Sequence, residues 1–244
     1  MTNFTISVAG WKVAINALFE STRTYCEDYL CIGEPDFTVA ITKEDIFMER
    51  KKSEQEDILE GIPVRQFSDA YLETLAVYRK LCTQLLQRDA LLFHGSVIAV
   101  DGEGYLFTAK SGTGKSTHTG LWRQEFGPRA EMINDDKPLL KLTPGGILAC
   151  GTPWNGKHRL GCSKMVPLKA ICILERDKIN QIRRIPSREA LPMLLQQSFR
   201  TATPAGMMQL LDKLEQIMDR TNIYRLGCNM DPEAARVAYA GMQE

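Results

Sequence analysis

Residues 105–117, YLFTAKSGTGKST, constrain this chain more than any other segment. The apolar run predicts a strand, the glycines predict a turn, and the Lys-Ser-Thr that follows is typical of a helix start. A glycine-rich turn that leads into a helix N-terminus gathers backbone N–H groups around one point, and such a cradle binds phosphate oxygens. The segment therefore predicts a strand, a loop and a helix built around a phosphate group.

The segment matches the P-loop pattern G-x-x-x-x-G-K-[ST], except that Ala109 holds the first position. In this pattern the lysine reaches the β- and γ-phosphates, and the next hydroxyl binds Mg²⁺. Lys115 and Ser116 are the matching residues, so we predict a site for ATP with Mg²⁺. The loop residues expected to contact the nucleotide are Ser111, Gly112, Thr113, Gly114, Lys115, Ser116 and Thr117.

Two adjacent carboxylates follow the loop in the sequence. Asp135 and Asp136 come after an apolar pair, about twenty residues downstream of the lysine. A carboxylate at such a strand end can complete the Mg²⁺ site of a P-loop protein. An ordinary solvated turn is the alternative for Asp-Asp-Lys-Pro taken alone, but together with the loop the pair indicates nucleotide binding.

The composition argues against several classes of protein. Thirty basic residues balance thirty acidic ones, so no overall charge favours nucleic acid or a membrane surface. No apolar run reaches the ~18–20 residues of a membrane span, and the N-terminal residues do not have the pattern of a signal peptide. Seven scattered cysteines without C-x-x-C spacing favour free thiols over a zinc site. We therefore expect a cytoplasmic protein without a nucleic-acid or membrane partner.

The sequence pattern changes near residue 66. Residues 1–66 contain two stretches in which apolar and polar residues alternate, as in half-buried strands. The charged run 49–57 is expected to be a solvated loop. From Ser68 the apolar spacing predicts a long helix, after which strands and helices alternate. We expect a small β-rich N-terminal subdomain, residues 1–66, and an α/β domain, residues 67–244, whose mixed sheet is flanked by helices.

Several elements of the second domain can be predicted individually. Turn residues at Asp101-Gly102 and at 144–146 predict two β-hairpins. The apolar run 168–176 predicts a buried strand, with residues 179–185 as its expected partner, and residues 203–221 predict an amphipathic helix.

Residues 91–117, together with 133–136, resemble the catalytic domain of bacterial HPr kinase/phosphorylase and its kinase-like relatives. These proteins share a P-loop core with phosphoenolpyruvate carboxykinases. His94-Gly95, residues 112–116 and Asp135-Asp136 match the family in order and spacing. The resemblance extends over roughly residues 90–230 and indicates a divergent member of this family.

The resemblance implies a kinase that uses ATP and Mg²⁺ to phosphorylate a serine-type hydroxyl of a protein, peptide or small molecule. Asp135 is then the candidate general base, and Asp136 joins Ser116 as a candidate Mg²⁺ ligand. Lys115 neutralises phosphate charge, and His94 is expected to orient Asp135 through a hydrogen bond. The chain could also assemble into a homo-oligomer, and the sequence leaves this question open.

Residues 151–164, GTPWNGKHRLGCSK, are basic and rich in glycine, and Trp154 is expected to be exposed. We interpret this segment as a loop that closes over the γ-phosphate or holds the acceptor, with Lys157 and Arg159 as its cations. The alternative is the tip of a surface hairpin. Arg176, at the end of a predicted strand, is a secondary candidate for the same role.

Two other functions stay open from the sequence. The first is a non-catalytic nucleotide-binding regulator or peptide-recognition protein, with residues 1–66 as the recognition module. The second is a carboxykinase-type enzyme acting on oxaloacetate, which needs a second metal site and further cations. Three histidines in 244 residues equip the chain poorly for that reaction.

Overall fold

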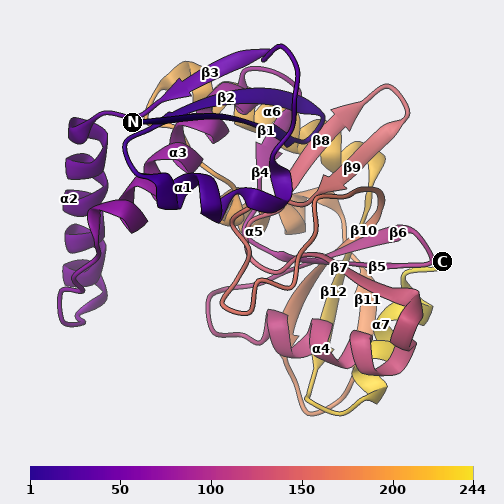
Figure 1. Cartoon of the computed structure of the whole chain (residues 1–244). Coiled ribbons are helices and arrows are strands. Elements are labelled where there is room, and N and C mark those ends of the chain that lie inside the picture. The colour runs from indigo at the N-terminus through magenta and orange to yellow at the C-terminus, as the bar shows by residue number, and fades with distance from the viewer. Residues whose placement is uncertain (244) are drawn as a thin grey trace. The chain divides into compact units, whose positions relative to one another are not determined.

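The computed structural model describes residues 1–243, which form a mixed α/β arrangement (Figure 1). Contacts group the chain into one unit of residues 1–84 and a second unit that begins at residue 85. The predicted domain boundary after residue 66 stays a prediction. Within the described residues, no helix is both long enough and apolar enough to cross a membrane.

The first unit contains a small sheet in the order β1-β2-β3, with β1 and β2 antiparallel and β2 and β3 parallel. Ala9 and Gly10 both have positive φ, as the tight turn between the first two strands requires. Three α-helices and a 3-10 turn complete the unit. Its elements are β1 (Thr2–Val8), β2 (Trp11–Ala17), α1 (Glu20–Tyr25), η1 (Glu27–Tyr29), β3 (Phe37–Ala40), α2 (Lys43–Glu60) and α3 (Asp69–Leu86).

The charged run 49–57 is not a loop but part of helix α2, so this prediction was wrong. Thr42 and Asp45 form a capping box at the start of the helix, and Gly61 ends it in a left-handed conformation. Glu, Lys and Gln are good helix formers, so a run rich in these residues can be helical without an apolar face. The first unit is therefore more helical than the predicted β-rich subdomain.

The second unit is built on a nine-stranded mixed sheet with the path β4-β8-β9-β10-β6-β5-β7, extended by β12 beside β10 and β11 beside β12. Both predicted hairpins are present, as the antiparallel pairs β5–β6 and β8–β9. The strands are β4 (Ala90–Leu92), β5 (Ser96–Val100), β6 (Glu103–Thr108), β7 (Ala130–Asn134), β8 (Leu139–Thr143), β9 (Gly146–Cys150), β10 (Met165–Arg176), β11 (Gln181–Arg184) and β12 (Asn222–Cys228).

Strand β10 is the centre of this sheet. Its first residues pair with β9, and the rest lies between β6 and β12, parallel to both. Because both edges of β10 are occupied there, β11 pairs with β12 instead. The expected pairing of residues 179–185 with residues 168–176 was therefore wrong.

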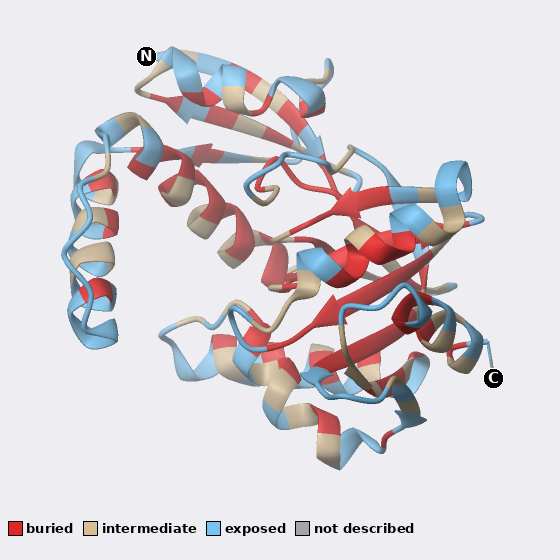
Figure 2. Ribbon diagram, turned by 90° about the horizontal axis from the view of Figure 1, so that it is seen from below, coloured by how far each residue is buried: buried red, intermediate tan, exposed pale blue. Residues whose placement is uncertain are grey.

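Helices cover both faces of the larger sheet. Strand β6 shows the alternation: Leu106 belongs to the apolar cluster that includes Leu210 of α6, whereas Phe107 belongs to the cluster that includes Trp122 of α4. Figure 2 shows the buried strands between these layers. The elements are α4 (Lys115–Phe126), η2 (Gly127–Arg129), α5 (Ser187–Gln197), α6 (Pro204–Arg220) and α7 (Glu233–Gly241).

The three parallel strands β6, β10 and β12 end at the same edge of the sheet. Their carboxyl ends lead into residues 109–114, Asp177 and Asn229. Ligand sites of α/β sheets commonly lie at this edge, outside the carboxyl ends of the strands.

Candidate functional site

Residues 109–114, here called the phosphate loop, connect β6 to the first turn of α4. Gly112 and Gly114 have φ values of 75° and 123°, a region that favours glycine. The carbonyl of Lys110 accepts hydrogen bonds from the N–H and the hydroxyl of Thr113, at 3.2 and 2.8 Å. Ala109 is buried and does not have positive φ, so the first position of the pattern needs no glycine here.

Lys115 begins α4, and its Nζ lies 3.5 Å from the carbonyl oxygen of Ala109. Burial lowers the pKa of this lysine, and the charge of Lys137 acts in the same direction. The charges of Asp136 and Asp135 act against this shift and raise the pKa. The half-buried Lys115 ammonium thus lies near enough to both carboxylates for their charges to act on it.

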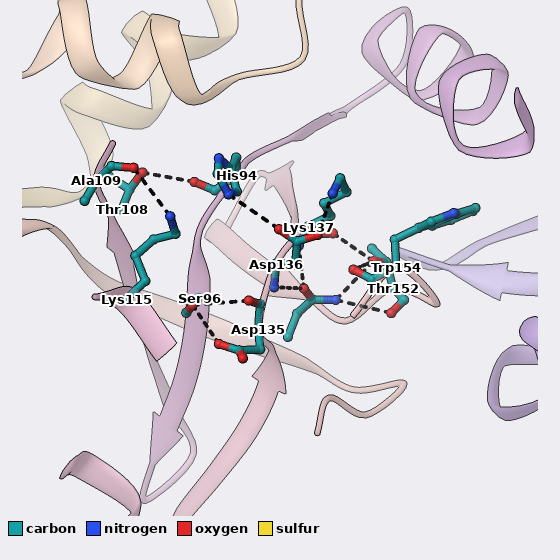
Figure 3. Close-up of polar contacts among 11 residues, drawn as sticks. His94, Ser96, Thr108, Ala109, Lys115, Asp135, Asp136, Lys137, Thr152 and Trp154 are labelled. Carbon is teal, nitrogen blue, oxygen red and sulfur yellow. Dashed lines mark hydrogen bonds and ion pairs between the residues drawn. The ribbon is translucent and has the colours of Figure 1, made fainter. Parts of the chain in front are cut away.

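Asp135 follows β7 and is only 8% exposed. The hydroxyl of Ser96 donates a hydrogen bond of 2.8 Å to its Oδ1 (Figure 3). Gly156 passes so close that a Cβ there would lie 3.3 Å from Oδ2. The carboxylate is thus fixed by β5 on one side and approached by the segment 151–164 on the other.

The Asp136 carboxylate has different partners. It forms an ion pair with Lys137, and its Oδ1 lies 3.5 Å from Nε2 of His94. Burial lowers the pKa of His94, as do the charges of Lys115 and Lys137, whereas the Asp136 charge raises it. His94 therefore faces Asp136, and the hydrogen bond to Asp135 that we expected from His94 comes from Ser96 (Figure 3).

Asn134 and Thr152, which were not among the predicted site residues, shape the turn that carries both carboxylates. The Oδ1 of Asn134 accepts the backbone N–H groups of Asp136 and Lys137, at 2.9 and 2.7 Å. Its Nδ2 donates a hydrogen bond of 3.0 Å to Oγ1 of Thr152, and the Thr152 hydroxyl donates a hydrogen bond to the Lys137 carbonyl. An Asn directly before the turn was the available signal, because its side chain commonly bonds the backbone two residues on.

Trp154 is 4% exposed, so the expectation of a surface tryptophan was wrong. The segment turns inward there because its backbone is tied to the sheet: Gly151 donates to the Lys164 carbonyl, and Cys162 donates to the Ile133 carbonyl. A Cβ on Gly151 would lie 1.7 Å from the Cys162 carbonyl oxygen, so this close approach requires glycine.

A cavity of about 570 Å³ brings most of the predicted site together. It is lined by His94, Gly112, Gly114, Lys115, Ser116, Thr117, Asp135, Asp136, Gly156, Lys157 and His158. Ser111, Thr113 and Arg159 are predicted contacts that do not line it; Arg159 is exposed in a left-handed conformation.

The donor set fits Mg²⁺ better than a transition metal. Mg²⁺ is usually held by one or two carboxylates together with substrate phosphates and water, and Ser116 and Asp136 offer a hydroxyl and a carboxylate in this cavity. Over residues 1–243 there is no group of three or more His, Cys, Asp or Glu side chains placed to hold a metal ion.

Arg176 contacts the phosphate loop rather than the cavity. Its guanidinium donates to the carbonyl oxygens of Gly112, at 2.5 Å, and Thr113, at 3.2 Å. The Arg176 side chain therefore holds the loop from the end of β10. This contact differs from the predicted role, in which Arg176 would close over the γ-phosphate.

Comparison with known proteins gives one family match and distant similarity to solved structures. The Hpr(Ser) kinase/phosphatase from Coxiella burnetii is similar in structure with a TM-score of 0.37 and 12% identity, over 63% of this chain and 99% of that chain. No curated protein matches the sequence. Residues 64–235 match the family described as SynChlorMet cassette protein ScmC, and because this match spans most of the sequence, the chain belongs to that family.

Proposed function

We propose that this protein is a P-loop kinase with a phosphoenolpyruvate carboxykinase-like core, which transfers the γ-phosphate of ATP to a serine-type hydroxyl. The observation that carries the proposal is the convergence of the phosphate loop, Lys115, Ser116, Asp135 and Asp136 on one cavity. The resemblance of residues 91–117 and 133–136 to HPr kinases supports the same reaction class.

Phosphoryl transfer requires positioning and charge neutralisation more than covalent chemistry. The open N–H groups at the start of α4 and the Lys115 ammonium would hold the β- and γ-phosphates. Ser116 and Asp136 would hold Mg²⁺, which neutralises charge on the transferred group when it is bound. Lys157, at the exposed side of the cavity, would add a cation near the same oxygens.

In the transfer step the acceptor oxygen forms a bond to the γ-phosphorus while the bond from this phosphorus to the bridging oxygen breaks. The hydroxyl proton passes to Asp135, and the products are a phosphate ester and ADP. The hydrogen bond from Ser96 leaves Oδ2 of Asp135 available to accept this proton. The acceptor is a serine-bearing protein, a serine-bearing peptide or a small hydroxyl compound.

Two substitutions test the roles of binding and catalysis. Binding of ATP with Mg²⁺ is measured by calorimetry, and transfer is measured with γ-labelled ATP against serine-bearing peptides and free serine. We expect Lys115→Ala to abolish binding, because the phosphates lose their cation. We expect Asp135→Asn to keep the affinity and lose at least a hundredfold in transfer rate.

Matched controls are available in the same unit. Lys169→Ala removes a lysine that pairs with Glu103 outside the cavity, and Asp101→Asn removes an exposed carboxylate that pairs with Arg129. Both controls should keep wild-type binding and transfer. Unchanged transfer by Asp135→Asn would remove Asp135 from the base role, and nucleotide binding without transfer to any acceptor would favour a non-catalytic regulator.

A further inference from the structure

A second cavity, of about 510 Å³, also borders the phosphate loop. It shares Gly112, Gly114 and Thr117 with the cavity of the proposed active site, so a molecule bound across the loop would reach both. Its remaining walls come from α4 and from the residues at the ends of β10 and β12. We call it the end cavity.

His118 on the end cavity carries an unpaired hydrogen-bond donor. Its Nε2 accepts the indole N–H of Trp122 at 3.0 Å, so this nitrogen has no proton and the proton of the imidazole is on Nδ1. The Nδ1 atom is buried and has no partner, and the residue is 2% exposed. A buried donor without a partner is costly, and an acceptor supplied from the end cavity would remove that cost.

Three other polar side chains of the lining, Arg176, Asp177 and Asn229, are already engaged. Arg176 donates to the loop carbonyls, and the Asp177 carboxylate accepts the backbone N–H of Lys178. The side-chain nitrogen of Asn229 donates to the Lys178 carbonyl and to Asp231. Within the described lining, His118 is the buried polar group that lacks a partner.

The remaining walls are apolar. Leu174 is buried at the end of β10, whereas Met230 lies beyond β12 with 77% of its surface exposed. An exposed methionine beside a cavity is an adaptable apolar surface against which a flat ring can pack. Apolar walls together with a few placed polar groups are typical of a small-molecule site.

We propose that the end cavity binds the nucleoside of the nucleotide whose phosphates lie on the phosphate loop, with His118 donating its Nδ1–H to a lone pair of the base or ribose. This inference rests on the proposed function, since it requires a nucleotide at the loop. It assigns a specificity-determining residue that belongs to neither the P-loop pattern nor the carboxylate pair.

The test compares ATP with inorganic tripolyphosphate, both with Mg²⁺, by calorimetry on the full chain. Tripolyphosphate has the phosphates and lacks the nucleoside, so it reports on the loop alone. His118→Phe removes the donor and keeps a ring against Phe107, whose centroid lies 4.6 Å away. We expect it to weaken ATP binding about tenfold and to leave tripolyphosphate binding unchanged.

A second variant avoids any effect on folding. Met230→Ser changes an exposed side chain and should weaken ATP binding about threefold to tenfold without affecting tripolyphosphate. Met208→Ser, which changes an exposed methionine of α6 outside the cavity, is the matched control and should bind both ligands like the wild type.

The outcomes separate this inference from the proposed function. If the wild type binds neither ligand, the proposed function fails and the inference fails with it. If both ligands bind and neither His118→Phe nor Met230→Ser changes the ratio of the two affinities, only the inference is overturned.

Discussion

At the residue scale, two histidines of the second unit differ in environment. His94 is half-buried, and its pKa is lowered by burial and by Lys115 and Lys137, against the opposing charge of Asp136. His118 lies between α4 and the sheet, where burial lowers its pKa to about 4. Because the Nε2 of His118 accepts a hydrogen bond, only the neutral ring fits this position.

The buried His118 makes the stability depend on pH. In the unfolded chain a histidine binds a proton below about pH 6.5, whereas in the folded protein it does so only near pH 4. The unfolded state therefore holds more protons between these values, and the free energy of unfolding falls as the pH is lowered from 6.5 to 4. We expect a loss of roughly 3 kcal/mol from this group, measured by denaturant unfolding.

Substitution isolates the contribution of His118 from that of the carboxylates. His118→Phe should show a smaller loss of stability over the same pH range than the wild type. His158→Gln, at an exposed position, is the control and should keep the wild-type pH dependence. If the free energy of unfolding changed equally with pH in His118→Phe and in the wild type, the assignment of this pH dependence to His118 would be contradicted.

The place of single residues in the candidate site could be predicted only where a local motif indicates it. Lys115 and Ser116 follow from the loop pattern, and Asp135 and Asp136 follow from their place after an apolar strand. Ser96 could not be assigned to Asp135, because the two residues meet only when β5 pairs with β7. The unpaired Nδ1–H of His118 likewise exists only in the packed structure.

At the element scale, the phosphate loop is held from the end of a neighbouring strand. Arg176 is the last residue of β10, and its two hydrogen bonds fix carbonyls of Gly112 and Thr113. Fixing these carbonyls limits the conformations of the loop, so a ligand that the loop binds would have less loop entropy to offset.

Removing this contact should weaken binding of any phosphate chain. We expect Arg176→Gln to lower the affinities for ATP and for tripolyphosphate equally, by about tenfold, because the loop must then be ordered during binding. Calorimetry measures both affinities, and Arg184→Gln on β11 is the control with unchanged binding. A selective loss of ATP binding would show that Arg176 contacts the nucleoside instead.

Most elements were predictable from periodicity, and their pairing was not. The amphipathic helix α6 and the buried strand β10 match their predicted segments, because spacing and apolar runs are local signals. Helix α2 was missed, since nine mostly charged residues show no apolar face although Thr42 and Gly61 mark its ends. The partner of β11 depends on which edges of the sheet are free, and no local pattern contains that information.

At the scale of the whole molecule, charge and the candidate site are distributed unevenly. Residues 1–84 contain 14 acidic and nine basic side chains, whereas residues 85–244 contain 16 acidic and 21 basic ones. A surplus of positive charge favours a triphosphate, and all the candidate contacts belong to this second, basic part. The match to the ScmC family, residues 64–235, also spans most of it.

Hydrogen exchange can therefore test where the nucleotide binds. A ligand at a hundred times its dissociation constant stabilises the folded state by about 2.7 kcal/mol, so amides near it exchange more slowly. We expect Mg²⁺ and ATP to slow exchange in residues 105–120 and 130–137, and to leave β1 and α2 unchanged. Lys115→Ala should show no such protection. Protection of α2 in the wild type would contradict this prediction, because it would place part of the nucleotide site, or of a change coupled to it, among residues 1–84.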